Sequence, residues 1–295
     1  MRRPNFFIVG APRSGTTAMY EYLRQHPEVF MPYRKEPGYF GSDLTKGPPY
    51  LTEQSYLALF AGAKNEKRLG EATVWYLYSE TAPREIREFA PDARIIIMLR
   101  DPVEMIHSLH AHFLYTDDEE IAGFAEALAA EEDRRAGRRL PPHARRPEGL
   151  QYRRCGRYAP FVRRYLDVFG RENVSVIVFD DFRTDTAAVY RETLEFLDVQ
   201  PGFRPAFEVV NPSKRSRSLR LQRAIHSPSF TRAIARLPDP AHHRVWRLLK
   251  RLNMRPEERP TLDPELRRRL RAEFAPSVEE LAGLLGRDLS AWTRG

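Results

Sequence analysis

The chain has 295 residues, of which 42% are hydrophobic and 30% charged, so it can form a substantial core and is too apolar to be disordered as a whole. Its 48 Lys and Arg residues outnumber the 40 Asp and Glu residues, and the net charge of +8 favours anionic ligands such as phosphates, sulfates and nucleotides. The single cysteine, Cys155, excludes an intramolecular disulfide and a cysteine-rich zinc site.

The sequence gives no sign of a targeting or membrane segment. The apolar run at residues 6–9 is too short for a secretory signal, and no stretch approaches the roughly 20 apolar residues of a membrane span. We therefore expect a cytoplasmic protein with no membrane span. The basic residues are dispersed among acidic ones, which is not the clustered basic surface of a nucleic-acid-binding protein.

The N-terminal segment begins with a phosphate-binding pattern. Residues 5–10 form a continuous apolar run ended by a glycine, which predicts a short buried strand. A loop at 11–16 contains Gly15, and a helical pattern follows at 17–24. Strand, glycine-bearing loop and helix in this order are typical of the start of a phosphate-binding α/β domain.

Further strands and helices alternate along the chain. The apolar runs at 93–99 and 174–179 predict strands, and helical patterns cover 103–114, 158–169 and 184–197. This alternation predicts an α/β fold with a P-loop-like parallel sheet flanked by helices.

Two stretches interrupt the alternation. Residues 136–150 are rich in Arg, Pro and Gly and predict an exposed connection, and residues 200–220 predict a long loop. Beyond residue 219 the pattern is helical, with no strand candidate. We expect a single domain over residues 1–295, with a nucleotide-binding core at about 1–200 and a basic loop and helical C-terminal part at about 201–295.

The loop after the first strand carries the most chemical information. Ser14 and Gly15 lead into a helix whose N-terminus offers unpaired N–H groups and a positive dipole end, and Thr16 and Thr17 add hydroxyl donors. Arg13 adds a planar charged fork. The loop suits a phosphate or sulfate ester but lacks the lysine of a Walker A motif. A tight turn with an incidental arginine is the alternative interpretation.

A second anion-binding pair is predicted around Arg100 and Ser108. Arg100 ends the strand at 93–99, and Ser108 lies on the second turn of the next helix, so both can converge on one anion beyond the strand ends. Arginine can meet a phosphate through two parallel hydrogen bonds. In the alternative interpretation Arg100 pairs with a helix end and Ser108 is ordinary helix surface.

The ordered set of motifs resembles sulfotransferases that use 3′-phosphoadenosine 5′-phosphosulfate (PAPS). Residues 7–17 are similar to the 5′-phosphosulfate loop of that family, and 35–40 to the Lys-Glu segment of its heparan-sulfate type. Residues 99–108 are similar to its 3′-phosphate motif, and 156–158 and 285–292 also resemble it. The set spans nearly the whole chain in family order.

The resemblance implies roles for individual residues. It places the general base on Glu36, with Lys35 and Arg13 neutralising charge on the phosphate and sulfate. In the alternative interpretation residues 35–37 are a solvated turn before an aromatic pair. It also implies that PAPS is held by the residues Arg13, Ser14, Gly15, Thr16, Thr17, Arg100, Ser108, Tyr158, Lys214 and Arg215.

The same resemblance implies sulfuryl transfer to a hydroxyl or amine, with adenosine 3′,5′-bisphosphate as product and no metal. The Lys-Glu segment favours a small-molecule or glycan acceptor such as a sugar, glycolipid or glycosylated metabolite. Neither the acceptor nor the oligomeric state can be predicted from the sequence.

Two arginine-rich stretches have less specific interpretations. Lys214, Arg215 and Arg217 fall where the family has a basic loop over the 3′-phosphate, although an exposed basic linker is an equal alternative. Residues 267–271 are predicted to be a solvated helix face.

Three other titratable residues remain open. Glu71 is a secondary candidate for lining the acceptor site. His107 and His110 share a helix face, which leaves a histidine base conceivable, but no cysteine or carboxylate completes a metal site with them.

A P-loop kinase that uses Mg-ATP is the alternative enzyme class. Residues 177–180 could serve as a Walker B strand ending in aspartate. The missing loop lysine argues against this class, because magnesium-nucleotide chemistry normally relies on it.

Overall fold

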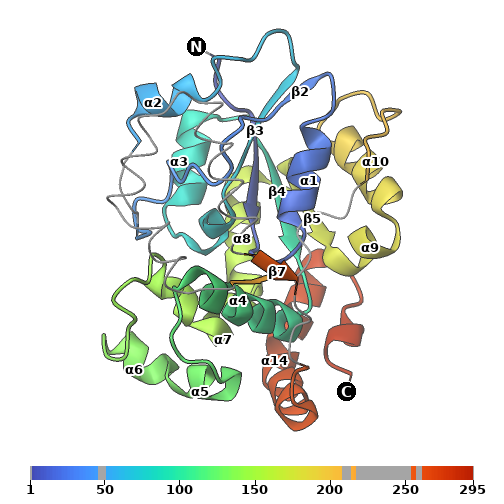
Figure 1. Ribbon diagram of the computed structural model, residues 1–295. Helices are drawn as coiled ribbons and strands as arrows, with labels where there is room; N and C mark the ends of the chain where they lie inside the picture. Colours follow the sequence, from blue (N-terminus) through green and yellow to red (C-terminus); the bar gives the residue numbers. More distant parts are fainter. Residues whose placement is uncertain (1, 46–50, 208–213, 217–253, 257–260, 295) are drawn as a thin grey trace.

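The computed structural model describes residues 2–45, 51–207, 214–216, 254–256 and 261–294. Five parallel strands form the central sheet in the order β2-β3-β1-β4-β5 (Figure 1). Their bounds are Val29–Phe30 for β2, Arg68–Ala72 for β3, Phe6–Gly10 for β1, Arg94–Leu99 for β4 and Val174–Val178 for β5.

The central strand β1 is buried along its whole length, and its side chains alternate between two cores. Phe6 and Ile8 join a core formed with helices α1, α9 and α10, while Phe7 and Val9 join the core on the opposite face. A strand covered on both faces needs apolar residues at every position, which explains the continuous run. The three helices span Thr16–Leu23, Phe179–Thr184 and Thr186–Phe196.

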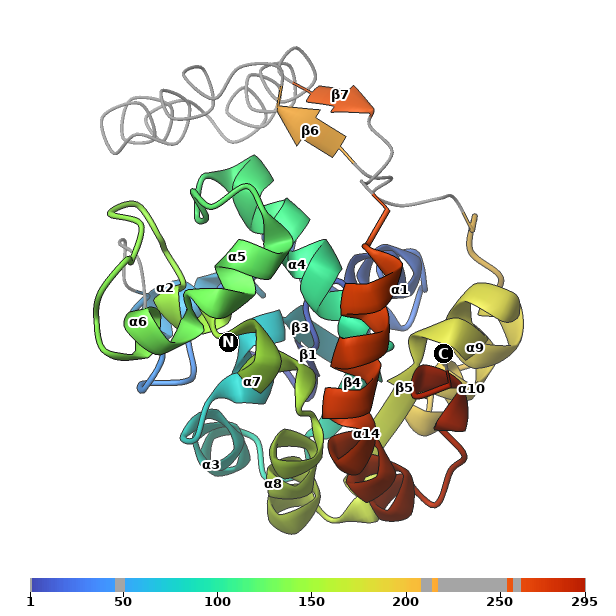
Figure 2. The same ribbon diagram turned by 90° about the horizontal axis from the view of Figure 1, so that it is seen from below.

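The larger core lies under helices α3, α4, α7, α8 and α14. They span Ala82–Phe89, Pro102–Thr116, Tyr152–Gly156, Ala159–Phe169 and Pro264–Leu285. Helix α14 lies beside α4 and α8, as Figures 1 and 2 show. The short elements are α2 (Glu53–Ala58), η1 (Val74–Tyr78), α5 (Phe124–Ala129), α6 (Glu131–Arg135), η2 (Pro147–Leu150), η3 (Arg171–Asn173) and η4 (Ser290–Trp292).

The predicted fold class is confirmed, and the three predicted strands correspond to β1, β4 and β5. Strands β2 and β3 were not predicted. The expectation of no strand beyond residue 219 was wrong: β7 (Met254–Pro256) pairs antiparallel with β6 (Lys214–Ser216). A three-residue strand carries no readable periodicity, and its pairing depends on a partner distant in sequence.

Two smaller expectations also need correction. Residues 136–150 are not exposed throughout, because Gly149 and Leu150 are buried in η2, and a Cβ on Gly149 would lie 2.5 Å from the ring of Trp75. Residues 267–271 are not simply solvated: Arg267 forms a 2.6 Å ion pair with Glu104, which fastens α14 to α4.

Candidate active site

The loop between β1 and α1 lies at the carboxyl edge of the sheet. The Ala11 N–H donates to the Met98 carbonyl at 2.6 Å, which ties the loop to β4. Gly15 precedes α1 with a left-handed φ of 88°, and a Cβ there would lie 2.9 Å from the Phe179 ring. Ser14 and Thr16 are buried, and Thr17 is half-buried. The loop therefore turns sharply enough to point the first N–H groups of α1 at the edge of the sheet.

Residues from the two predicted anion-binding motifs meet in the structure. The Arg13 Nε donates to the Ser108 Oγ at 3.0 Å, across 95 positions of sequence. The Arg100 Nη1 lies 3.5 Å from the Arg13 carbonyl oxygen. Two guanidinium groups and a hydroxyl thus gather beyond the ends of β1 and β4, where open α/β sheets bind ligands.

Arg100 is held by groups from several elements. Its guanidinium carbon lies 5.1 Å from the centroid of the Phe179 ring, and its Nη2 lies 3.8 Å from a carboxylate oxygen of Glu104. The Tyr158 hydroxyl donates to the Arg100 carbonyl at 3.0 Å, while the Tyr158 side chain is buried. The contact visible for Tyr158 is therefore with the main chain of Arg100.

Asp101 fixes the helix that carries Ser108. Its Oδ1 accepts from the N–H groups of Val103 at 2.8 Å and Glu104 at 3.3 Å, and Pro102 is the first residue of α4. A carboxylate at this end also complements the helix dipole. Burial raises the pKa of Asp101, against the hydrogen bonds and the nearby Arg271 guanidinium, which lower it.

The Lys35–Glu36 segment lies along β3 and the start of η1. The Glu36 N–H donates to the Ala72 carbonyl at 2.9 Å, and the Glu36 Oε2 accepts from the Val74 N–H at 3.0 Å. The Lys35 ammonium pairs with the other oxygen, Oε1. The Glu36 side chain remains 38% exposed, so its carboxylate is held in place and still accessible to a ligand.

Glu71 lies behind this segment and is fully buried. Its Oε1 accepts from the Thr73 hydroxyl at 2.7 Å, and its Oε2 accepts from the Tyr56 hydroxyl. Burial raises the pKa of Glu71 from 4.5 to about 7, partly offset by these hydrogen bonds. Because it is enclosed, Glu71 does not line an acceptor site in this structure.

The histidines of α4 are buried among aromatic rings. The His107 ring centroid lies 5.1 Å from that of Phe124, and the His110 Nε2 lies 2.9 Å from the Ile121 carbonyl oxygen. Burial lowers the pKa of His110. These positions fit core packing better than a catalytic base. In the part of the chain that the structure describes, no three His, Cys, Asp or Glu residues form a metal-binding group.

The basic tract is only partly described. Lys214 and Arg215 belong to β6, which lies beside α4 (Figure 2), and the structure describes their main chain. Arg217 lies outside the described residues. The predicted contact of this tract with a nucleotide phosphate therefore stays a prediction.

The aspartate proposed for a kinase has a structural contact instead. Strand β5 ends at Val178, and Asp180 lies in the first turn of α9, where its Oδ2 accepts from the Trp292 Nε1 at 3.0 Å. The pair fastens the C-terminal turn η4 to α9.

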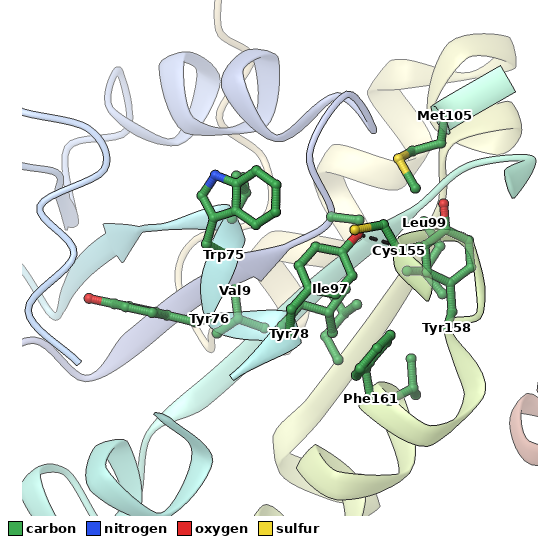
Figure 3. Close-up of a cluster of buried hydrophobic side chains, with 14 of the residues drawn as sticks. Val9, Trp75, Tyr76, Tyr78, Ile97, Leu99, Met105, Cys155, Tyr158 and Phe161 are labelled. Atoms are coloured by element: carbon green, nitrogen blue, oxygen red, sulfur yellow. Dashed lines mark hydrogen bonds between the residues drawn. The ribbon is translucent and has the colours of Figure 1, made fainter. Parts of the chain in front are cut away.

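A cavity of about 160 Å³ lies against η1 and against residues 43–45, which follow the segment of Glu36 in the sequence. It is lined by Asp43, Leu44, Thr45, Trp75, Tyr78, Glu148, Arg154 and Cys155. Figure 3 shows Trp75, Tyr78 and Cys155 as part of the buried cluster, and the Tyr78 hydroxyl donates to the Cys155 carbonyl at 3.2 Å. Arg146 donates to the Thr45 carbonyl and lies 3.8 Å from where a Gly38 Cβ would stand, which connects the cavity to the Glu36 segment.

Two residues at the site were not predicted from the sequence. Phe179 packs against both Gly15 and Arg100, and its position directly after the apolar run of β5 was the available signal. Tyr56 reaches Glu71 from α2. No local pattern marks that contact, because α2 and β3 are brought together by the fold.

Comparisons with known proteins agree with this geometry. The family model described as "Sulfotransferase domain" matches residues 3–282. The crystal structure of a sulfotransferase from Alicyclobacillus acidocaldarius is 33% identical, with a TM-score of 0.74 and 100% of both chains covered. The chain therefore belongs to the sulfotransferase family, and its fold is that of a sulfotransferase.

The curated relatives that match this chain are longer proteins. Bifunctional heparan sulfate N-deacetylase/N-sulfotransferase 4 of Mus musculus is 30% identical over 213 residues, which are 68% of this chain and 23% of that protein. Carbohydrate sulfotransferase 15 of Homo sapiens is 28% identical over 251 residues, covering 67% and 44%. The chain thus matches less than half the length of either relative. Within the described ranges, none of the helices combines the length and apolar character needed to cross a bilayer.

Proposed function

We propose that the chain transfers a sulfuryl group from PAPS to a hydroxyl or amine of an acceptor. The observation that carries this proposal is the meeting of Arg13, Ser108 and Arg100 at the carboxyl ends of β1 and β4. Two arginines and a helix N-terminus at one edge suit a ligand with phosphates at two positions. Gly15 allows the loop its left-handed turn into α1 and its close packing against Phe179, where a Cβ would not fit.

PAPS supplies the activated sulfuryl group and leaves as adenosine 3′,5′-bisphosphate. Glu36 accepts the proton from the acceptor O–H or N–H as that atom forms its new bond to sulfur. The main-chain N–H of Val74 fixes the Glu36 carboxylate, and its exposure gives the acceptor access. Arg13 and Lys35 neutralise the charge that grows on the departing phosphate oxygen as the old S–O bond breaks.

In this proposal Arg100 and Ser108 bind the 3′-phosphate. The 5′-phosphate is surrounded by Ser14, Gly15, Thr16 and Thr17. Tyr158 supports Arg100 through its main chain. Lys214 and Arg215 are proposed to close over the nucleotide from β6.

We infer that the acceptor is a carbohydrate, glycolipid or glycosylated metabolite. The names of the relatives include heparan sulfate and carbohydrate sulfotransferases. The cavity beside the Glu36 segment combines two aromatic residues, Trp75 and Tyr78, with two carboxylates, Asp43 and Glu148. Aromatic walls with a few polar groups are the usual construction of a small-molecule site, and carboxylates can accept hydrogen bonds from sugar hydroxyls.

Thermal unfolding with adenosine 3′,5′-bisphosphate tests the nucleotide site. A ligand at 100 times its Kd adds about 2.7 kcal/mol, which should raise the Tm of a domain of this size by roughly 5–10 °C. The shift should persist in EDTA. A shift with Mg-ATP and none with the bisphosphate would overturn the proposal in favour of a kinase.

The role of Glu36 is tested by Glu36→Gln. The amide cannot take the proton, so turnover should be abolished while the shift with the bisphosphate persists. Full activity in Glu36→Gln would show that another group is the base.

A further inference from the structure

The segment that carries Glu36, residues 36–40, is hydrogen-bonded at every second residue to the end of β3 and to the residues that follow it. The Glu36 N–H donates to the Ala72 carbonyl at 2.9 Å, and the Gly38 N–H donates to the Thr73 Oγ1 at 3.3 Å. The Phe40 N–H donates to the Tyr76 Oη at 3.1 Å. Two of these three acceptors are side-chain hydroxyls, whose lone pairs face the segment only when the hydroxyl hydrogens point elsewhere.

Glu71 lies beside both hydroxyls. The Thr73 hydroxyl donates to its Oε1 at 2.7 Å, and the Tyr76 hydroxyl is close enough to the carboxyl group to lower the pKa of Glu71. The Tyr56 hydroxyl donates to Oε2. An ionised carboxylate only accepts hydrogen bonds, so it turns each of these hydroxyl hydrogens toward itself.

We infer that Glu71 is a positioning residue for the general base: it orients the hydroxyls of Thr73 and Tyr76, which in turn hold the segment that carries Glu36. The inference rests on the proposed function for the role of Glu36. The segment needs these hydrogen bonds because Glu36 has a φ of 60°. Such a backbone conformation is uncommon for a residue with a side chain and persists only where surrounding contacts fix it.

The titratable groups around Glu71 come from four parts of the chain. They are Tyr56 on α2, Tyr76 on η1, Tyr165 on α8 and Glu36. Burial is the largest cause that raises the pKa of Glu71 to about 7. A protonated Glu71 carries a donor and can no longer accept from every hydroxyl around it. When its hydrogen is directed at Thr73 or Tyr76, that hydroxyl turns its own hydrogen toward the segment and loses the N–H that it accepts.

The substitution Glu71→Gln imitates that protonated state, because the amide presents one acceptor and one donor in the same shape. We expect hydrogen exchange of a peptide over residues 36–40 to become about five- to tenfold faster in Glu71→Gln at pH 8, the loss of about one hydrogen bond. A peptide over β4, residues 94–99, should keep its wild-type rate.

The pH dependence separates positioning from a general loosening. After correction for the intrinsic rate, wild-type exchange of residues 36–40 should increase as the pH falls through about 7. In Glu71→Gln the corrected rate should not change between pH 6 and 8. Unchanged protection at pH 8, or equal acceleration of both peptides, would overturn the inference.

Substitutions at two neighbouring positions add independent tests. Tyr56→Phe keeps the ring and removes a hydroxyl that bonds Glu71 but not the segment. Because that hydrogen bond lowers the pKa of Glu71, the pH dependence of exchange over residues 36–40 should move to higher pH in Tyr56→Phe. Thr73→Val removes the acceptor of the Gly38 N–H, so its residues 36–40 should exchange as fast as those of Glu71→Gln. Thr73→Ser keeps the hydroxyl, so exchange of the same residues should be as slow as in the wild type. If Glu71→Gln fails to fold, the contrast between the two Thr73 variants decides the question.

Activity distinguishes this inference from the proposed function. Release of adenosine 3′,5′-bisphosphate from PAPS is followed with desulfated heparin as acceptor. Glu71→Gln should lower kcat about tenfold and leave bisphosphate affinity within twofold. An inactive Glu36→Gln beside a fully active Glu71→Gln would refute only the inference, whereas a fully active Glu36→Gln would refute the base on which both rest.

Discussion

The buried carboxyl of Glu71 predicts a pH-dependent stability that does not depend on any ligand. Burial raises the pKa of Glu71 in the folded protein from 4.5 to about 7. In that range the folded state binds a proton that the unfolded state does not, so the free energy of unfolding falls as the pH rises from about 4.5 to about 7. Above both pKa values, the stability that the protonated Glu71 contributes is lost completely.

The raised pKa of Glu71 corresponds to about 3 kcal/mol of unfolding free energy. Glu71→Gln carries no titrating group at this position, so it lacks this contribution at every pH. Between pH 4.5 and pH 8 the wild type should therefore lose about 3 kcal/mol of unfolding free energy relative to Glu71→Gln. All other titrating groups are common to both proteins and cancel in the difference.

Urea unfolding of both proteins at several pH values between 4.5 and 8 measures this quantity. The comparison uses differences between proteins, so a constant effect of the amide on the hydrogen-bond network drops out. A difference that stays constant over this range would refute the reasoning, since it would mean that Glu71 ionises as easily in the folded protein as in the unfolded chain. A difference of opposite sign would show that the hydroxyl hydrogen bonds outweigh burial.

Three further predictions follow from the site and the core. Arg100→Ala should weaken binding of adenosine 3′,5′-bisphosphate about 10- to 100-fold by calorimetry, because a charge-assisted contact is worth about 1.5–3 kcal/mol; the exposed Arg163→Ala is the control and should bind normally. Gly15→Ala should lower stability by about 1–3 kcal/mol in urea unfolding, because its φ of 88° and the Phe179 ring at 2.9 Å oppose a Cβ. Cys155 should not react with a thiol reagent in the native protein at pH 8, because burial raises its pKa to about 12, and rapid labelling would contradict its enclosure.

Much of the sheet could be predicted because three of its strands are covered on both faces. Such strands need apolar residues at successive positions, and the runs of β1, β4 and β5 show this directly. Strand β3 was missed because it contains Gly70 and Glu71, two residues that are unfavourable in strands. Their reasons lie outside the strand: a Cβ on Gly70 would lie 2.0 Å from the Phe6 ring, and Glu71 is satisfied by hydroxyls from elsewhere.

The site was predictable motif by motif, but not as a set of contacts. A parallel sheet places the carboxyl ends of its strands at one edge, so the loop of Arg13 and the strand end at Arg100 were expected to converge. The direct contact of Arg13 with Ser108 depends on a side-chain conformation that no spacing encodes. The position of Glu71 behind Glu36 was also out of reach, because its hydrogen-bond partners are Tyr56 on α2 and Thr73, which follows β3, and only the fold brings α2 to this place.

The pairing of β1 with β3 fixes how the two parts of the site lie relative to each other. The phosphate-binding loop continues β1, while the Glu36 segment is held by β3 and the residues just after it, and the Thr73 N–H donates to the Ile8 carbonyl at 3.1 Å. In this register Phe6 lies opposite Gly70, where no Cβ fits. A slip of one residue would turn Glu71 to the other face of the sheet and bring a side chain against the Phe6 ring. The same glycine that makes β3 hard to recognise in the sequence therefore keeps the proposed base aligned with the phosphate-binding loop.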